Sequence, residues 1–291
     1  MDVIHVPVML EEVLAALELK SSGIYIDATL GLGGHAEGIL QCAQGCTLIG
    51  IDRDENAIEI ARERLKGFEK VHLIKNRFSN MKDVVNSLGY EKVNGIILDA
   101  GVSTLHLKAE GRGFSFMRDE PLDMRMDQSS DLTAEKVVNS YKEKDLADII
   151  YQYGEERYSR RIAKSIVFAR RKNRITSCKE LATIIEKAVG RRGRIHPATR
   201  SFQALRIKVN SELDELSKAV DSGAELLEEK GRFCVLSYHS LEDRIVKNAF
   251  RKLAKEGLFR IITKKPIVPE REEQKLNPSS RSAKLRVAEK I

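Results

Sequence analysis

The chain has 291 residues, a length that allows one large domain or two of moderate size. Its 42% hydrophobic and 32% charged residues exclude a disordered or fibrous protein. No stretch approaches the ~18 uncharged apolar residues that a membrane span needs. The N-terminus lacks the basic start and apolar run of a signal peptide, so we expect a cytoplasmic protein without a membrane partner.

Four cysteines are scattered along the chain, and only Cys42 and Cys46 lie close together. Three intervening residues, with no second pair and no histidine nearby, do not match a zinc-binding pattern. We therefore predict free thiols and no bound metal.

The net charge of +7 is distributed unevenly. Residues 151–210 contain 16 Lys and Arg but four Asp and Glu, a balance of +12 that leaves −5 for the remainder. A basic segment of this kind indicates a polyanionic partner, most often a nucleic acid. A solvated, arginine-rich helix face is the alternative that charge alone leaves open.

Up to residue 105, short β-rich runs alternate with amphipathic stretches, a pattern typical of a parallel sheet covered by helices. We expect helices over 10–17, 36–43 and 56–65. The strands are expected over 23–28, 47–51, 71–74 and 93–98.

The alternation stops after residue 105. Helical periodicity then predicts helices over 134–138, 146–151, 158–169 and 181–189. The alternation of strands and helices resumes with a long helix over 207–229 and a strand over 232–238. Two strand candidates, at 259–263 and 283–288, fit an antiparallel hairpin. The predicted fold is α/β and Rossmann-like, with a mostly parallel sheet, a closing antiparallel hairpin and an inserted helical domain. Its parts are 1–105, the insertion 106–205, and 206–291.

A glycine-rich turn follows the first expected strand. Residues 31–36 match the pattern G-x-G-x-x-A, whose glycines let backbone amides approach a ligand at a helix N-terminus. Asp52 ends the second strand about 20 residues later, where a carboxylate can bind ribose hydroxyls. Asp27 precedes the glycines; it would repel a pyrophosphate but suits a cationic ammonium, which favours S-adenosylmethionine over NAD. A turn required only for tight packing is the alternative.

Two other expected strands end in polar residues at the edge where open α/β sheets bind ligands. Asp99 can accept a hydrogen bond from a cofactor or an acceptor amine, or it can cap the next element. His239 begins the run His-Ser-Leu-Glu-Asp, whose spacing does not fit a hydrolase triad. We favour substrate positioning for it, and a His–acid pair that holds a loop is the alternative.

The insertion mixes aromatic and basic residues. Residues 153–161 combine tyrosines with arginines, and Arg191, Arg192, Arg194 and Arg200 add positive charge. Such mixtures suit phosphate contact and base stacking, although the aromatic spacing also suits ordinary helix packing.

Several longer motifs resemble those of the bacterial ribosomal RNA small-subunit methyltransferase H family, also called MraW, nearly from end to end. They are 5–9 (HVPVM), 33–35 (GGH), 112–116 (RGFSF), 121–127 (PLDMRMD), 153–161 (YGEERYSRR), 196–206 (HPATRSFQALR), 239–244 (HSLEDR) and 281–286 (RSAKLR). The family uses S-adenosylmethionine to methylate the exocyclic N4 amine of a cytidine in the decoding region of 16S rRNA. The resemblance therefore implies this activity and cofactor, a class I methyltransferase fold, and the small ribosomal subunit as partner.

Carried over by position, the resemblance implies cofactor contacts at Gly33, Gly34, His35, Asp52, Phe78 and Asp99. His106 stands where relatives have a cofactor-binding glutamine, and an imidazole can replace one hydrogen bond of that amide.

The acceptor amine must be aligned and must lose a proton. We expect Asp99, Ser103 and His239 as its catalytic contacts, and the sequence does not separate positioning from proton acceptance. An NAD-type oxidoreductase and a non-catalytic rRNA-binding assembly factor remain as alternative functions. The oligomeric state stays open, a homo-oligomer included.

Overall fold

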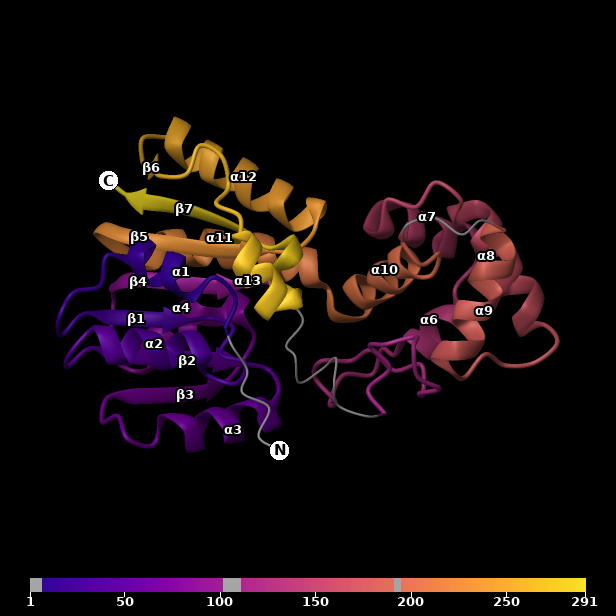
Figure 1. Ribbon diagram of the computed structural model, residues 1–291, viewed down its shortest axis with the longest axis horizontal. Helices are drawn as coiled ribbons and strands as arrows, with labels where there is room; N and C mark the ends of the chain where they lie inside the picture. The colour runs from indigo at the N-terminus through magenta and orange to yellow at the C-terminus, as the bar shows by residue number, and fades with distance from the viewer. Residues whose placement is uncertain (1–6, 102–110, 191–194) are drawn as a thin grey trace. The chain divides into compact units, whose positions relative to one another are not determined.

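The computed structural model describes residues 7–101, 111–190 and 195–291. The chain divides into two compact units (Figure 1). Unit 1 consists of Met1–Ser103 and Leu213–Ile291, and unit 2 of Thr104–Glu212.

Unit 1 is built on a seven-stranded sheet with the strand order β3-β2-β1-β4-β5-β7-β6 (Figure 1). Strands β1 to β5 are mutually parallel, whereas β7 runs antiparallel to both β5 and β6. This confirms the predicted α/β class and the closing antiparallel pair. The strands are β1 (Ile24–Asp27), β2 (Thr47–Asp52), β3 (Val71–Lys75), β4 (Val93–Asp99), β5 (Leu227–Ser237), β6 (Phe259–Ile261) and β7 (Lys284–Lys290).

The helices of unit 1 flank this sheet. In chain order they are α1 (Leu10–Leu17), α2 (Gly34–Cys42), α3 (Glu55–Leu65), α4 (Met81–Ser87), α11 (Glu212–Leu226), α12 (Ser240–Lys255) and α13 (Arg271–Leu276), with 3-10 turns η1 (Phe78–Asn80) and η2 (Pro278–Ser282).

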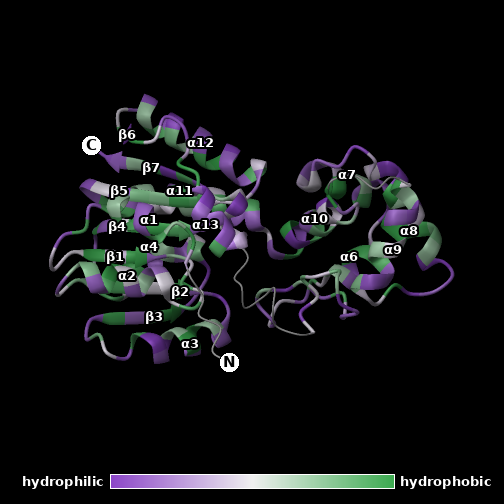
Figure 2. Ribbon diagram, viewed as in Figure 1, coloured by the Kyte–Doolittle hydropathy of each residue, from purple (hydrophilic) through white to green (hydrophobic). Residues whose placement is uncertain are grey.

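The central strands are apolar without interruption because both faces of the sheet are covered. In β4, Ile96 and Leu98 belong to one buried cluster, and Ile97 between them belongs to the cluster on the opposite face. Figure 2 shows the hydrophobic residues concentrated along these strands. The buried clusters on the two faces of the sheet fix the strands, and thereby the edge at which their polar ends lie.

Unit 2 contains five described helices around a core of its own: α6 (Ala134–Ser140), α7 (Glu143–Gly154), α8 (Ser159–Arg170), α9 (Cys178–Val189) and α10 (Thr199–Asn210). The first four confirm the helices expected from periodicity. Local sequence explains where two of them begin, because the Thr133 and Ser177 side chains cap α6 and α9. Gly190, with φ 66°, ends α9.

The predicted single helix over 207–229 is wrong. Helix α10 ends at Asn210, and Ser211 adopts a left-handed conformation with φ 52°, after which α11 begins. The Arg206 guanidinium donates to both carboxylate oxygens of Glu212 at 2.8–3.2 Å across this break. The end of the expected helix, from Leu227, is extended instead because it pairs with Val93 of β4.

Candidate active site

Three aspartates end neighbouring strands at one edge of the unit 1 sheet. Asp27, Asp52 and Asp99 are the last residues of β1, β2 and β4. Asp27 is level with Gly50 of β2 and Ile97 of β4 in the register, so Asp52 and Asp99 extend two residues beyond it. The predicted juxtaposition of these strand ends is therefore present.

Asp27 is the most deeply buried of the three, with 1% of its surface exposed. Its Oδ1 accepts a hydrogen bond from the Thr29 N–H at 3.2 Å, whereas Oδ2 is buried and meets no donor among the described residues. Burial raises the pKa of Asp27 to about 6, against the lowering effect of His35, and the charges of Asp99 and Asp52 raise it further. A buried carboxylate oxygen without a donor indicates that a ligand supplies one.

The glycine turn is tied to the end of β2. The N–H of Gly31 donates to Asp52 Oδ2 at 2.8 Å, and the N–H of Asp54 donates to Oδ1 at 2.9 Å. Each oxygen retains a second lone pair, so Asp52 can still accept from hydroxyl groups. Gly33 has φ 77°, a left-handed conformation that favours glycine, and a Cβ there would make a tight contact of 3.3 Å with the Ala61 Cβ.

The start of α2 carries the other predicted glycine-turn contacts. A Cβ on Gly34 would lie 3.1 Å from the Pro7 Cβ. The His35 ring is buried and its Nε2 donates to the Val8 carbonyl at 2.9 Å, so this side chain anchors the N-terminal segment. The backbone N–H groups in the first turn of α2, which lack intrahelical acceptors, are available to a ligand.

Phe78 begins η1 and is half-buried. A carboxylate from α11 holds this turn: Ser79 Oγ donates to Glu215 Oε2 at 2.6 Å, and Arg77 Nη1 lies 3.4 Å from Glu215 Oε1. Ser222 Oγ donates to the Ser79 carbonyl at 3.1 Å. Sequence reasoning missed Glu215, and no local signal marks it, because its partners lie well over a hundred residues away.

Asp99 is bonded from three directions. Its N–H donates to Thr29 Oγ1 at 2.6 Å, and its Oδ1 accepts from the Gly101 N–H at 3.2 Å. The Tyr238 hydroxyl donates to its carboxylate; burial, then this neighbouring charge and hydrogen bond, hold the pKa of Tyr238 well above its usual value. Gly101 leaves space for that ring, since a Cβ there would lie 2.5 Å from Tyr238 Cε2. Tyr238 is thus a site residue that sequence reasoning did not select.

His239 is the N-cap of α12. Its Nδ1 accepts from the Glu242 N–H at 3.4 Å, and Glu242 Oε2 accepts from the N–H groups of Tyr238 and His239 at 2.8 and 3.2 Å. Nε2 lies 3.1 Å from Glu242 Oε1, an ion-pair distance without hydrogen-bond geometry. This arrangement matches the alternative reading, a His–acid pair that holds a loop, and a catalytic role of His239 stays a prediction.

Some sequence candidates have no structural description. Ser103 and His106 lie outside the described residues, as do Arg191, Arg192 and Arg194. The four cysteines are free; burial raises the pKa of Cys178 and Cys234 to about 12, which makes their thiols poor nucleophiles.

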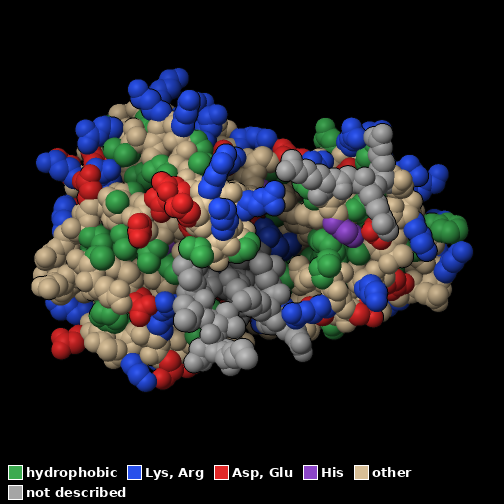
Figure 3. All heavy atoms as spheres, in the orientation of Figure 1, with side chains coloured by type: hydrophobic (Ala, Val, Ile, Leu, Met, Phe, Trp, Pro, Cys, Tyr) green, Lys and Arg blue, Asp and Glu red, His purple; other side chains and the backbone are tan. Residues whose placement is uncertain are grey.

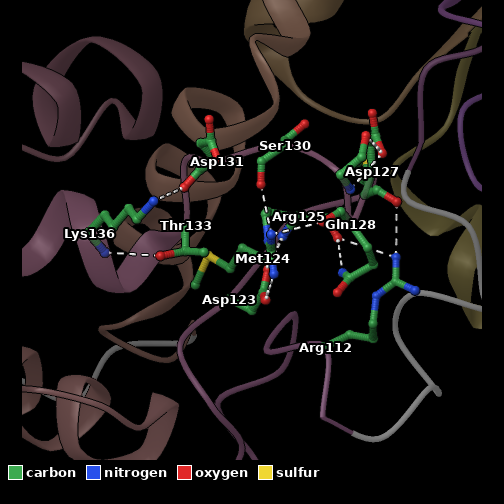
Figure 4. A network of polar contacts seen from close by, with 12 residues as sticks. Arg112, Asp123, Met124, Arg125, Asp127, Gln128, Ser130, Asp131, Thr133 and Lys136 are labelled. Carbon is green, nitrogen blue, oxygen red and sulfur yellow. Dashed lines mark hydrogen bonds and ion pairs between the residues drawn. The ribbon is translucent and has the colours of Figure 1, made fainter.

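The motif at 121–127 forms a polar network in unit 2 (Figure 4). The Arg125 guanidinium donates to both Asp123 oxygens at 2.7–2.8 Å, and Arg112 Nη2 donates to the Arg125 and Met126 carbonyls. Met124, with φ 63°, is held in this strained conformation by buried Asn210, which accepts from the Met126 N–H and donates to the Met124 carbonyl, both at 2.8 Å. In this network the polar side chains of the motif and its neighbours hold the backbone of this segment in place.

An open sheet of this topology, with a glycine turn after β1 and acidic ends on β1, β2 and β4, defines a class I, Rossmann-like methyltransferase fold. The model of the MraW methylase family matches residues 2–291, so the chain belongs to that family.

The chain is similar over its whole length to several members of the family. It is 50% identical over 291 residues to the ribosomal RNA small subunit methyltransferase H of Persephonella marina, with 99% of both chains covered. It is 48% identical to that of Sulfurihydrogenibium sp., with 99% of both covered, and 46% identical to that of Clostridium botulinum, with all of both covered.

Solved structures resemble the chain more distantly. An rRNA methylase from Streptococcus thermophilus shares 13% identity at a TM-score of 0.46, with 100% of this chain and 99% of that one covered. A Streptococcus mutans protein in complex with SAH shares 14% identity at a TM-score of 0.47, with 99% and 100% covered.

Proposed function

We propose that this chain transfers a methyl group from S-adenosylmethionine to the exocyclic N4 amine of a cytidine in 16S rRNA. The observation that carries the proposal is the buried Oδ2 of Asp27 beside the glycine turn, which has no partner among the described residues, in a chain of the MraW methylase family. Relatives of nearly equal length bear the name ribosomal RNA small subunit methyltransferase H, which supports the substrate.

The chain's own residues fit this cofactor. Asp27 would bind the ammonium group, since its Oδ2 meets no donor in the described part of the chain and an ammonium ion has only donors. Asp52 would accept from the ribose hydroxyls with its remaining lone pairs. The backbone at Gly33, Gly34 and His35 and the ring of Phe78 would complete the cofactor contacts. When bound, the cofactor supplies a methyl group on a positively charged sulfur, which is the electrophile.

The same residues disfavour the NAD-type alternative. Asp27 lies immediately before the turn that would have to approach a pyrophosphate, and the neighbouring Asp52 and Asp99 add negative charge. A site for a ligand with an ammonium group and no phosphate is consistent with this concentration of carboxylates.

Asp99 is the residue we assign to the acceptor amine. The lone pair of a cytosine amine is delocalised into the ring, so an acceptor for an amine N–H helps to localise it on nitrogen. The Tyr238 hydroxyl and the Gly101 N–H hold the Asp99 carboxylate in place from the protein side. Such alignment can lower a barrier by about 7–11 kcal/mol in favourable cases. His239, through its cap on α12, would position Tyr238, and Ser103 remains a candidate contact.

Unit 2 is the candidate RNA-binding unit. It has 23 Lys and Arg against 15 Asp and Glu, a net charge of +8, whereas unit 1 has 27 against 28, a net charge of −1. Figure 3 shows Lys and Arg side chains over the visible surface of unit 2. We propose that the insertion at 106–205 binds the RNA, and that 1–105 and 206–291 together form the methyltransferase domain.

The chain would act in the cytoplasm on 16S rRNA, naked or in the small ribosomal subunit, with the target base unpaired or flipped out of its stack to reach the methyl group. Among the described residues, no helix is long and apolar enough to cross a membrane.

Methyl transfer from labelled S-adenosylmethionine tests the proposal. The purified protein is incubated with unmethylated small ribosomal subunits and, separately, with naked 16S rRNA, and the RNA is digested to nucleosides. We expect N4-methylcytidine, and Asp99→Asn protein serves as the control for contaminating activity. Cofactor binding without any methylated nucleoside would favour a non-catalytic assembly factor, and binding of NAD in its place would favour an oxidoreductase.

A further inference from the structure

Unit 2 holds a histidine ring in a fixed orientation at its surface. The ring of His196 stacks on that of Phe116, with centroids 4.5 Å apart and an interplanar angle of 24°. Phe116 in turn meets the edge of Phe202 from α10, at a centroid distance of 5.1 Å and an angle of 72°. Through Phe116 and Phe202 the histidine is attached to the core of unit 2.

Both nitrogens of the His196 ring are engaged. Nδ1 accepts from the Ala198 N–H at 3.2 Å, just before α10, so Nδ1 carries no hydrogen. Nε2 lies 3.1 Å from Glu186 Oε1 at the end of α9, an ion-pair distance. The ring is therefore held at Nδ1 and on one face, and the Glu186 carboxylate lies beside Nε2.

The remaining face of the ring is open to solvent. The His196 side chain is 36% exposed although Phe116 covers one face and both nitrogens have partners. Phe116 leaves the opposite face of the ring as the one that a stacking partner can reach. Fixing a surface side chain costs rotamer entropy, and an open, flat, immobilised ring is the geometry that a stacking partner requires.

The charges around His196 favour a nucleobase over a phosphate at this position. Glu186, 40% exposed, lies against Nε2 and would repel a phosphate there. Positive charge is available close by along the chain: Arg200, four residues further on, is 50% exposed, although its guanidinium also lies 3.9 Å from Glu156. Arg200 can thus contact the backbone of a nucleic acid whose base rests on the imidazole.

We propose that the open face of His196 is a stacking platform for an unpaired nucleobase of the substrate RNA. The inference rests on the proposed function and deepens it, because it assigns a particular base contact to unit 2. Ring-on-base stacking is tolerant of sequence, so this contact would add affinity without reading the identity of the base.

Three substitutions of His196 separate base stacking on the ring from simple shielding of Phe116. The affinity of the full-length protein for unmethylated 16S rRNA is measured for the parent and for His196→Ala, His196→Phe and His196→Leu. We expect roughly tenfold weaker binding for Ala and Leu, which lack a π face, and binding within about twofold of the parent for Phe. Leu still covers Phe116, so it controls for loss of that cover.

Two control variants sharpen the measurement. His72 in β3 of unit 1 also touches an aromatic ring, meeting Tyr90 edge-on at 6.2 Å, and His72→Ala should leave RNA affinity unchanged. Arg200→Ala should reduce the dependence of affinity on salt by about one unit of slope or less, whereas His196→Ala should lower affinity with the slope unchanged. Denaturant unfolding of each variant verifies that it is folded.

The outcomes distinguish the inference from the function on which it rests. Parent-like affinity of His196→Leu would show that the ring only shields Phe116, and equal losses for Ala, Leu and Phe would assign the effect to the ring nitrogens; either result overturns the platform. A parent that methylates 16S rRNA while the His196 variants bind normally sinks the inference alone. A parent that neither binds nor methylates RNA overturns both.

Discussion

Each unit buries a polar side chain in a family motif or beside one, and the two differ in whether that group is satisfied. Asn210 of unit 2 accepts from the Met126 N–H and donates to the Met124 and Arg206 carbonyls. Asp27 of unit 1 has one oxygen paired within the chain and one without a donor in the described part of the structure. The comparison teaches that burial alone does not mark a ligand site, because a buried polar group can be fully bonded within the chain.

The units also differ in charge. Unit 1 concentrates carboxylates at its sheet edge while its net charge is close to zero, and unit 2 carries an excess of positive charge. A small cationic ligand suits the first environment and a polyanion the second. If the chemistry belongs to unit 1, substitutions at its sheet edge should alter turnover or cofactor binding, and a destabilising substitution in unit 2 should leave cofactor binding intact.

The largest effect is expected for Asp99→Asn. The amide cannot accept a proton and offers one acceptor oxygen in place of two, so turnover should fall about 10²- to 10⁴-fold. Cofactor affinity should change much less. Single-turnover methyl transfer and calorimetry measure the two quantities, and Tyr238→Phe, which loses only the hydroxyl donated to Asp99, should show a smaller loss of turnover. Equal losses in turnover and cofactor affinity would assign Asp99 to the cofactor alone.

Asn210→Ala should destabilise unit 2 while the cofactor edge stays intact. The variant leaves the Met126 N–H and the Met124 carbonyl without their buried partner, which should lower the free energy of unfolding by about 2–4 kcal/mol. Denaturant unfolding measures the loss, and S-adenosylmethionine titration below the transition should match the parent. A loss of cofactor affinity would contradict the separation of roles between the units.

Asp27→Asn should make the folded protein more stable at neutral pH and weaken its binding of the cofactor. Because the folded-state pKa is raised from 3.8 to about 6, the folded protein binds more protons than the unfolded chain in that window. Stability therefore falls as pH rises from about 4 to 6, by about 2–3 kcal/mol in total, and that loss persists at higher pH. The asparagine variant should lack this loss.

The same change should weaken cofactor binding. Ammonium binding favours the ionised carboxylate, so the parent's affinity for S-adenosylmethionine should rise as pH increases through about 6, and the profile of Asp27→Asn should be flat. Calorimetry between pH 5 and 8 checks this. A parent profile without a step near that pH would remove Asp27 from the ammonium site.

The smallest effect is expected for Asp52→Ala. Loss of a charged acceptor for ribose hydroxyls should weaken cofactor binding by about 1–3 kcal/mol. Part of this loss would be indirect, because Asp52 also accepts from the Gly31 N–H. Asp54→Ala is the matched control: it removes the carboxylate that caps α3 and leaves Asp52 in place. Unchanged cofactor affinity in folded Asp52→Ala protein would contradict the assignment.

Sequence by itself determined the α/β class, the parallel strands, the helices of unit 2 and the edge where Asp27, Asp52 and Asp99 end their strands. These features follow from local periodicity, turn residues and the rule that parallel strands share a carboxyl edge. Family motifs added candidate residues. They did not distinguish a residue that anchors another segment, such as His35, from a residue whose side chain can still hydrogen-bond a ligand.

Only the tertiary structure decided which groups are satisfied. The pairing with Val93 that makes the chain extended from Leu227, the hydroxyl of Tyr238 on Asp99, and the Asp27 oxygen without a donor in the described part of the chain all depend on residues distant in the chain. Periodicity reports the face on which a side chain lies, but hydrogen-bond satisfaction depends on the distance to each donor in the folded chain. That distance is set by packing, which no local pattern encodes.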